Sequence, residues 1–223
     1  MQFIPEAEAQ ALRAHLATRL EGPVTVDLFV EPKSAIVIPG RSECELCEET
    51  RGLLEEVASL SEKISLTVHD VRSEPDAARQ AGVSRVPTLV LRGAARGVVR
   101  YLGIPAGLEF GTLLEDLSAV SRGTTTLADE SRTRLATLDK PVHVQVFVTP
   151  TCPYCPKVAS LAHSAAVENA NVTADVIEIS EFPDLAAHYR VRGVPKVVIN
   201  DTVELIGAQP EAAFVDAMLE AAA

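Results

Sequence analysis

Cys152-Pro153-Tyr154-Cys155 and Cys44-Glu45-Leu46-Cys47 are the two Cys-x-x-Cys motifs of this 223-residue chain, and they contain all four of its cysteines. Each motif begins 43 residues before the proline of a Val-Pro pair, Val194-Pro195 for one and Val86-Pro87 for the other. The offset between the two copies is 108 residues throughout. A thiol pair and a downstream proline therefore occur twice at one fixed spacing.

The repeat extends beyond these motifs. The stretch from Asp76 to Leu91 aligns without a gap with the stretch from Asp184 to Ile199. Both copies also share a late glycine followed seven residues later by phenylalanine, in Gly103–Phe110 and Gly207–Phe214. A period of about a hundred residues is the size of a domain rather than of a solenoid repeat. The chain is therefore predicted to contain two related domains.

We predict domains at residues 1–120 and 128–223, joined by a linker at 121–127 that is rich in Gly, Ser and Thr. Each domain has the same predicted order: an opening helix, a strand, a helix at the Cys motif, a strand, a short helix, two strands and a last helix. The predicted strands are 24–30, 64–69, 88–91, 98–102, 142–148, 172–179, 196–199 and 203–206. The predicted helices are 6–20, 44–60, 76–81, 108–120, 128–138, one from 152, 183–189 and 211–219. This order predicts an α/β fold.

The charge of the chain limits its partners. A net charge of −11 and a pI near 4.9 disfavour nucleic acid and anionic membranes, so a protein partner is expected. The N-terminus has no basic and apolar signal pattern, and no apolar run approaches the length of a bilayer span. We expect a cytoplasmic protein, and in that compartment a Cys-x-x-Cys motif is more often redox-active or metal-binding than a structural bridge.

A cysteine at the start of a helix lies among unpaired N–H groups at the positive end of the helix dipole, and both favour the thiolate. The second cysteine follows three residues later on the same helix face, close enough to attack a mixed disulfide. We therefore predict Cys152 as a nucleophile and Cys155 as its resolving thiol. Cys44 and Cys47 form the corresponding pair in the first copy.

The surroundings of the two motifs predict unequal sites. Four carboxylates surround the first motif, and like charge disfavours a thiolate; they are Glu43, Glu45, Glu48 and Glu49. Around the second motif no carboxylate occurs from Thr149 to Val167, and Lys157 adds a positive charge. Cys152 is therefore predicted to be the principal nucleophile and Cys44 to have the higher pKa. In the alternative, the glutamates are a solvated helix face that points away from the sulfurs.

The second copy resembles the protein disulfide oxidoreductases, proteins with two thioredoxin folds. The resemblance rests on Phe147–Thr151 followed by CPYCPK, on Asn171–Glu178 and on Val194-Pro195-Lys196, and it spans nearly the whole chain. The first copy also resembles the N-terminal domain of the flavoprotein subunit of alkyl hydroperoxide reductase, through residues 53–70 and 103–107.

These resemblances imply two tandem thioredoxin-like domains, each with a central mixed sheet flanked by helices. They imply reduction, oxidation or isomerisation of protein disulfides, with Cys44–Cys47 and Cys152–Cys155 as redox-active disulfides and no other cofactor or metal. They also imply that two prolines are cis and present backbone to a substrate; the predicted substrate-binding residues are Val86, Pro87, Val194, Pro195 and Tyr154. A thioredoxin-reductase-like flavoenzyme or a peroxiredoxin is the implied redox partner.

Other residues give weaker indications. Asp27 resembles the buried strand aspartate of thioredoxin and is a candidate proton acceptor for Cys47, with Gln145 at the matching place in the second copy. The alternative is an edge or solvent-facing position for Asp27. His163 is expected on a helix surface, and no histidine is assigned a role.

Two departures from related families concern the sites themselves. CPYC alone resembles glutaredoxin, but Thr149, Gly193 and the turn at 207–209 differ from its glutathione-holding pattern, so a dedicated glutathione site is not expected. Fourteen residues separate Phe29 from Cys44, whereas four separate Phe147 from Cys152. The excess, within residues 31–43, is predicted to form a partly apolar loop beside the first site.

Three alternatives stay open at this point. The chain is a dedicated electron-transfer adaptor to a peroxiredoxin or reductase, a chaperone inert toward disulfides, or a structural zinc protein with four cysteine ligands. Zinc accepts two such thiol pairs in a tetrahedral site. A gap of 104 residues between the pairs and the prolines of CPYC favour redox work.

Overall fold

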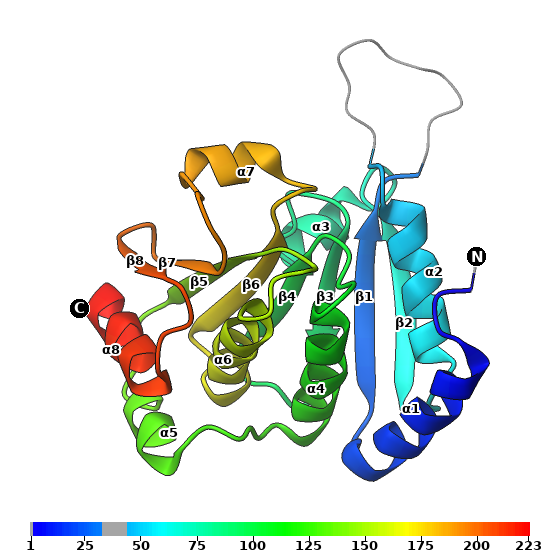
Figure 1. The fold of residues 1–223 in the computed structure, drawn as a ribbon, viewed down its shortest axis with the longest axis horizontal. Helices are drawn as coiled ribbons and strands as arrows, with labels where there is room; N and C mark the ends of the chain where they lie inside the picture. The colour runs from blue at the N-terminus through cyan, green and yellow to red at the C-terminus, as the bar shows by residue number, and fades with distance from the viewer. Residues whose placement is uncertain (1, 33–43) are drawn as a thin grey trace.

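The computed structural model describes residues 2–32 and 44–223, and they form an eight-stranded sheet with helices on both faces (Figure 1). The strands are β1 Val24–Val30, β2 Ile64–Asp70, β3 Thr88–Arg92, β4 Val98–Leu102, β5 Val142–Val148, β6 Val172–Glu178, β7 Lys196–Ile199 and β8 Val203–Ile206. The helices are α1 Glu6–Arg19, α2 Cys47–Ala58, α3 Pro75–Gln80, α4 Glu109–Arg122, α5 Asp129–Leu135, α6 Cys155–Glu168, α7 Pro183–His188 and α8 Glu211–Ala222.

The predicted repeat appears directly in the sheet, whose strand order is β2-β1-β3-β4-β6-β5-β7-β8. Within each half, the first strand pairs in parallel with the second and antiparallel with the third, which in turn pairs antiparallel with the fourth. Both halves therefore have the predicted mixed sheet. The exact domain limits stay a prediction, although α4 extends to Arg122, two residues into the segment expected to be the linker.

Side chains alternate between the two faces of the sheet. Val26 and Leu28 of β1 belong to the large core, to which α1, α2, α4, α5, α6 and α8 contribute, whereas Phe29 belongs to a small core against α3. In the second half, Phe147 and Val198 form the matching small core beside α7. The apolar strand runs thus build cores on both faces, as expected for strands covered by helices on each side.

The two halves are joined by parallel pairing of β4 with β6, which places Arg100 directly opposite Asp175. The Arg100 guanidinium donates two hydrogen bonds to the Asp175 carboxylate, at 2.6 and 2.8 Å, and donates from Nη1 to the carbonyls of Ala81 and Gly82 at the end of α3. His143 contacts the same carboxylate at 2.7 Å. The sequence did not predict this junction.

Burial alone would raise the pKa of Asp175, but hydrogen bonds from His143 and Arg100 outweigh it and lower the pKa. The carboxylate is thus held in its charged form at the junction, with its charge matched by its neighbours. Asp175 and Arg100 are 4% and 9% exposed, so losing one partner would leave a buried charge uncompensated.

We predict that Asp175→Asn lowers the free energy of unfolding by about 3–5 kcal/mol, because it leaves the Arg100 guanidinium buried without a counter-charge. Urea unfolding measures the loss. The control is Asp76→Asn, which breaks the exposed pair between Asp76 and Arg79 and should cost less than about 1 kcal/mol. Equal losses for the two variants would contradict the role assigned to the junction.

Candidate active sites

The first redox pair lies where α2 begins. Cys47 is the first residue of α2, and Cys44 precedes the helix by three residues, so the helix starts later than predicted. The two cysteines form a disulfide with their Cα atoms 5.5 Å apart. Cys44 is 9% exposed and Cys47 is 1% exposed, which leaves Cys44 as the sulfur that a substrate can reach.

The second pair repeats this geometry at the start of α6. Cys155 is the first helical residue, and a disulfide joins it to Cys152, again with 5.5 Å between the Cα atoms. Cys152 is 7% exposed and Cys155 is fully buried. In both motifs the first cysteine is accessible and the second is shielded, which is the order that a nucleophile and a resolving thiol need.

The Val-Pro pairs lie against these motifs. Both Val86–Pro87 and Val194–Pro195 are cis peptide bonds, and the carbonyl oxygen of Val194 lies 3.7 Å from the Cys152 sulfur. In each copy the proline carbonyl accepts a 2.9 Å hydrogen bond from the repeated glycine, Gly103 for Pro87 and Gly207 for Pro195. These glycines have φ values of 93° and 74°, a conformation that side chains rarely adopt. The repeated glycine thus closes the same proline loop in both halves.

Comparison with known proteins identifies the architecture. Residues 142–220 match the thioredoxin domain family. A protein disulfide oxidoreductase from Aeropyrum pernix k1 has a TM-score of 0.87 and 32% identity to this chain, covering 100% of this chain and 95% of that one. The chain belongs to the protein disulfide oxidoreductase family. It is therefore a dithiol–disulfide oxidoreductase with two tandem thioredoxin-like domains that acts through its Cys-x-x-Cys motifs.

Two further relatives place this oxidoreductase among redox proteins. Thioredoxin from Methanocaldococcus jannaschii is 36% identical over 78 residues, 34% of this chain and 92% of that protein. The NTD_N/C domain of alkylhydroperoxide reductase AhpF from Enterococcus faecalis (V583) has a TM-score of 0.84 and 26% identity, covering 97% of this chain and all of that one. The chain spans only 27% of the length of the alkyl hydroperoxide reductase protein that it matches in Xanthomonas campestris pv. phaseoli, with 28% identity over 153 residues, 68% of this chain.

The charges at the two helix starts differ. The first turn of α2 contains Glu48 and Glu49, whereas the first turn of α6 contains no acidic residue. Glu45 and Glu48 are exposed, so water screens part of their repulsion of a Cys44 thiolate. Glu43 and the inserted segment at 33–43 lie outside the described residues, so their predicted effect on the first site stays a prediction.

The oxidoreductase places Asp27 away from the cysteines. Asp27 is buried on the same face of β1 as Phe29, which packs beside α3, whereas Cys47 lies in the large core with Val26 and Leu28. Its carboxylate pairs with Arg92 and lies 3.7 Å from Nε2 of His69. The strand alternation thus puts Asp27 on the wrong face to accept a proton from Cys47, and it is not solvent-facing either.

His163 is not on the surface as expected, because it is fully buried between α4 and α6. Its Nδ1 lies 2.6 Å from Oδ2 of Asp116, and its Nε2 lies 3.0 Å from the carbonyl oxygen of Arg100. Burial lowers the pKa of His163, but the Asp116 charge outweighs this and raises it. Tyr101 donates a hydrogen bond to the same carboxylate. The prediction failed because α6 has alanines around most of its circumference, so no single face was marked as buried.

Sequence reasoning missed Glu109, the first residue of α4. It is 3% exposed, and neither of its carboxylate oxygens has a hydrogen-bond partner within residues 2–32 and 44–223. Burial raises its pKa to about 7. The available signal was a stripe of polar residues at helical spacing, Glu109, Thr112 and Asp116, which without the structure indicates only a solvated face.

Two contacts set the level of Glu109 relative to the second redox pair. Leu108 donates its N–H to the carbonyl of Pro150 at 2.9 Å, so α4 begins beside the loop that leads into Cys152. Asp116 and His163 meet further along, about 10 Å after Glu109 and about 12 Å after Cys155. The two helices therefore run side by side in the same direction, and Glu109 comes level with Cys155.

Tyr154 is 66% exposed between the two cysteines of the second motif, so its ring is available to a docked protein. The four cysteines form two separate disulfides, and residues 2–32 and 44–223 hold no cluster of three or more metal-binding side chains. The zinc alternative therefore gains no support. No helix in the described part of the chain is long and apolar enough to cross a membrane.

We predict that Glu109→Gln changes how stability depends on pH. A carboxyl whose pKa is raised by folding stabilises the protein fully below about pH 4.5, and this contribution is lost as the pH rises through about 7. The variant lacks that loss. Its free energy of unfolding relative to the parent should therefore rise by roughly 2–3 kcal/mol between pH 4.5 and pH 8.

Urea unfolding of the oxidised proteins at the two pH values gives this difference. The matched control is Glu130→Gln, which removes an exposed carboxylate at the start of α5 and should leave the pH dependence unchanged. A constant difference between Glu109→Gln and the parent at both pH values would show that Glu109 titrates normally.

Proposed function

We propose that the second site is the principal active site of this oxidoreductase, with Cys152 as the attacking thiolate and Cys155 as the resolving thiol. One observation carries the proposal: Cys152 is the accessible cysteine at the start of a helix whose first turn has no carboxylate, whereas α2 begins with two. A thiolate at a helix start is stabilised by the dipole and destabilised by neighbouring negative charge. The nearby Lys157 adds a positive charge.

The reaction balances as two exchanges. The Cys152 thiolate attacks one sulfur of a protein disulfide, forming a mixed disulfide and releasing the other substrate sulfur as a thiolate, which takes a proton. Cys155 then loses its proton and attacks the Cys152 sulfur, forming Cys152–Cys155 and releasing the second substrate sulfur. Two electrons pass from the protein dithiol to the substrate disulfide. Run in reverse, the same steps oxidise a substrate.

The buried Cys155 needs a nearby group to accept its proton, and Glu109 supports this role. Its carboxyl is buried, lacks a hydrogen-bond partner within the described residues and lies level with Cys155. With a pKa of about 7, it exchanges a proton near neutral pH, where a general base is most effective. Glu109 thus takes the role that the sequence had proposed for Asp27, although at the other site.

The cis peptide bonds support the predicted substrate contacts. We propose that a substrate strand lies across Val194–Pro195 in the second site and across Val86–Pro87 in the first, with the exposed Tyr154 ring beside it. The redox groups are the two disulfides, and the proposal includes no other cofactor.

Similarity to alkyl hydroperoxide reductase proteins supports a redox partner that is a peroxiredoxin or a flavoenzyme. Such a partner would restore the dithiol or receive its electrons. We propose that this exchange takes place in the cytoplasm, which agrees with the expectation from the N-terminal sequence.

We predict that Cys152→Ser nearly abolishes reduction of insulin disulfides in a turbidity assay, whereas Cys44→Ser keeps most of the activity, because the second site has the more stable thiolate. Equal losses would refute the asymmetry. Slow insulin reduction by the intact chain, combined with fast reduction of one peroxiredoxin, would instead favour the adaptor alternative.

A further inference from the structure

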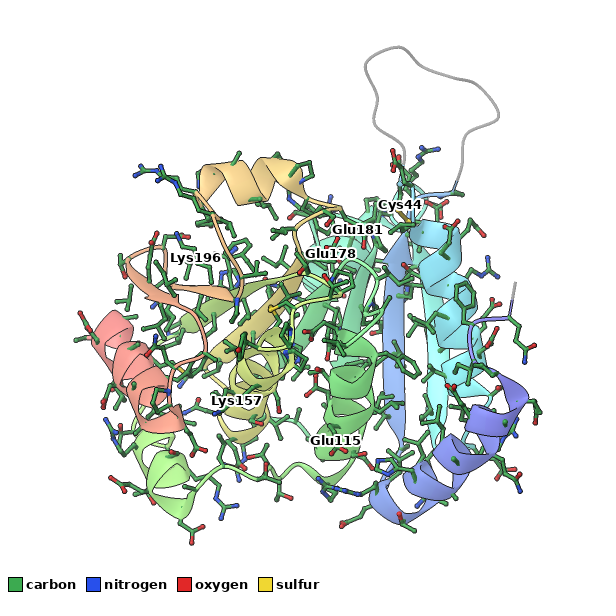
Figure 2. The ribbon with its side chains drawn as sticks, in the orientation of Figure 1. Cys44, Glu115, Lys157, Glu178, Glu181 and Lys196 are labelled. Atoms are coloured by element: carbon green, nitrogen blue, oxygen red, sulfur yellow. A yellow bond between two sulfur atoms is a disulfide. The ribbon has the colours of Figure 1, made fainter. Side chains whose placement is uncertain are left out.

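A cleft of about 850 Å³ opens beside the first redox site and has walls from both domains. Cys44 and Pro87 line one side, and the segment from β6 to α7, with Glu178 and Glu181, lines the other. Figure 2 shows Cys44, Glu178 and Glu181 gathered at one end of the molecule, with Lys196 farther away. The first site thus faces side chains that the second domain supplies.

Glu178 and Glu181 are held in place by backbone contacts. The N–H of Glu181 donates to Oε2 of Glu178 at 2.9 Å, and the N–H of Ile104 donates to Oε1 of Glu181 at 2.6 Å. Glu178 is 6% exposed, yet its Oε1 has no hydrogen-bond partner within the described residues. A buried carboxylate oxygen left without a partner is costly, so its position on the cleft wall points to a ligand that donates hydrogen bonds.

The cleft has an excess of negative charge. Its arginine, Arg85, is already neutralised by Asp184 at 2.6 Å. Within residues 2–32 and 44–223, three other carboxylates of the cleft have no ion-pair partner: Glu45, Glu178 and Glu181. Burial, together with the charge of Glu178, raises the pKa of Glu181 to about 7. A positive charge entering the cleft would favour both carboxylates in their ionised form.

We propose that this cleft binds a lysine or arginine side chain that lies next to the disulfide of a protein substrate of the first site. The ammonium or guanidinium group donates to the unpartnered Oε1 of Glu178, and the substrate disulfide then lies toward Cys44. The occupant is a residue of the substrate because the cleft is continuous with Cys44 and Pro87, where exchange takes place. This inference rests on the proposed function in one respect, namely that Cys44 exchanges with protein disulfides.

The second site serves as an internal comparison. Arg190 and Arg192 border a smaller pocket of about 340 Å³ that includes Gly193, just before Val194–Pro195. A basic substrate residue meets like charge there, so the same preference is not expected at the second site.

The test uses two model peptides with one disulfide each, identical except that lysines flank the disulfide in one and glutamates in the other. Full-length Cys152→Ser/Cys155→Ser protein, reduced beforehand, should reduce the lysine peptide at least about five-fold faster at low salt. Adding Glu178→Gln should lower this ratio at least about two-fold, and Glu45→Gln on the cleft rim is a second variant with the same expected direction. Glu220→Gln removes an exposed charge on the distant α8 and should leave the ratio unchanged. A ratio of one, or equal ratios for the Glu178 and Glu220 variants, would overturn the proposal.

Binding separates this proposal from the redox competence of the first site. Peptides of the same two sequences with serine in place of cysteine cannot exchange, and fluorescence anisotropy measures their affinity for the oxidised protein. Tighter binding of the lysine peptide without any exchange would refute the redox role of Cys44 but support the cleft as a cation site. Equal binding of both peptides would overturn the cleft proposal whatever the exchange rates show.

Discussion

The parallel pairing of β4 with β6 is the contact on which the rest of this structure depends. It fuses two four-stranded sheets into one, and the buried Arg100–Asp175 pair lies directly across it. Because Arg100 also donates to the end of α3 and its carbonyl contacts His163, one residue connects both faces of the junction. The relative position of the two redox sites is therefore set by a strand register rather than by a linker.

This junction gives each redox site a carboxylate from the other domain. Packing of α4 against α6 brings Glu109 of the first half level with Cys155 of the second half. The segment between β6 and α7 brings Glu178 and Glu181 of the second half to Cys44 of the first half. Two copies of one motif thus acquire different surroundings, because β4 is covered by a neighbouring domain whereas the matching strand β8 is an edge of the sheet. The repeat is symmetric in sequence, but its chemistry is not.

Much of this fold was predictable because its local signals are strong. β-branched runs such as Val24–Val30 and Val142–Val148 were predicted with their observed limits, and the cis prolines agree with the family resemblance. The junction was not predictable, since nothing in the β4 sequence says which strand it will pair with. Asp27 and His163 were misplaced because their burial depends on which helix covers which face. Glu109 was missed because a charged residue at a helix start has an ordinary explanation as a favourable dipole contact.

The central claim is that the two repeated sites are chemically unequal, and the pKa values of their accessible thiols test it most directly. The pH dependence of iodoacetamide alkylation gives these values, with Cys44→Ser/Cys47→Ser protein reporting Cys152 and Cys152→Ser/Cys155→Ser protein reporting Cys44. The account predicts that Cys152 titrates at least about one pH unit below Cys44. A Cys44 pKa equal to or below that of Cys152 would contradict it.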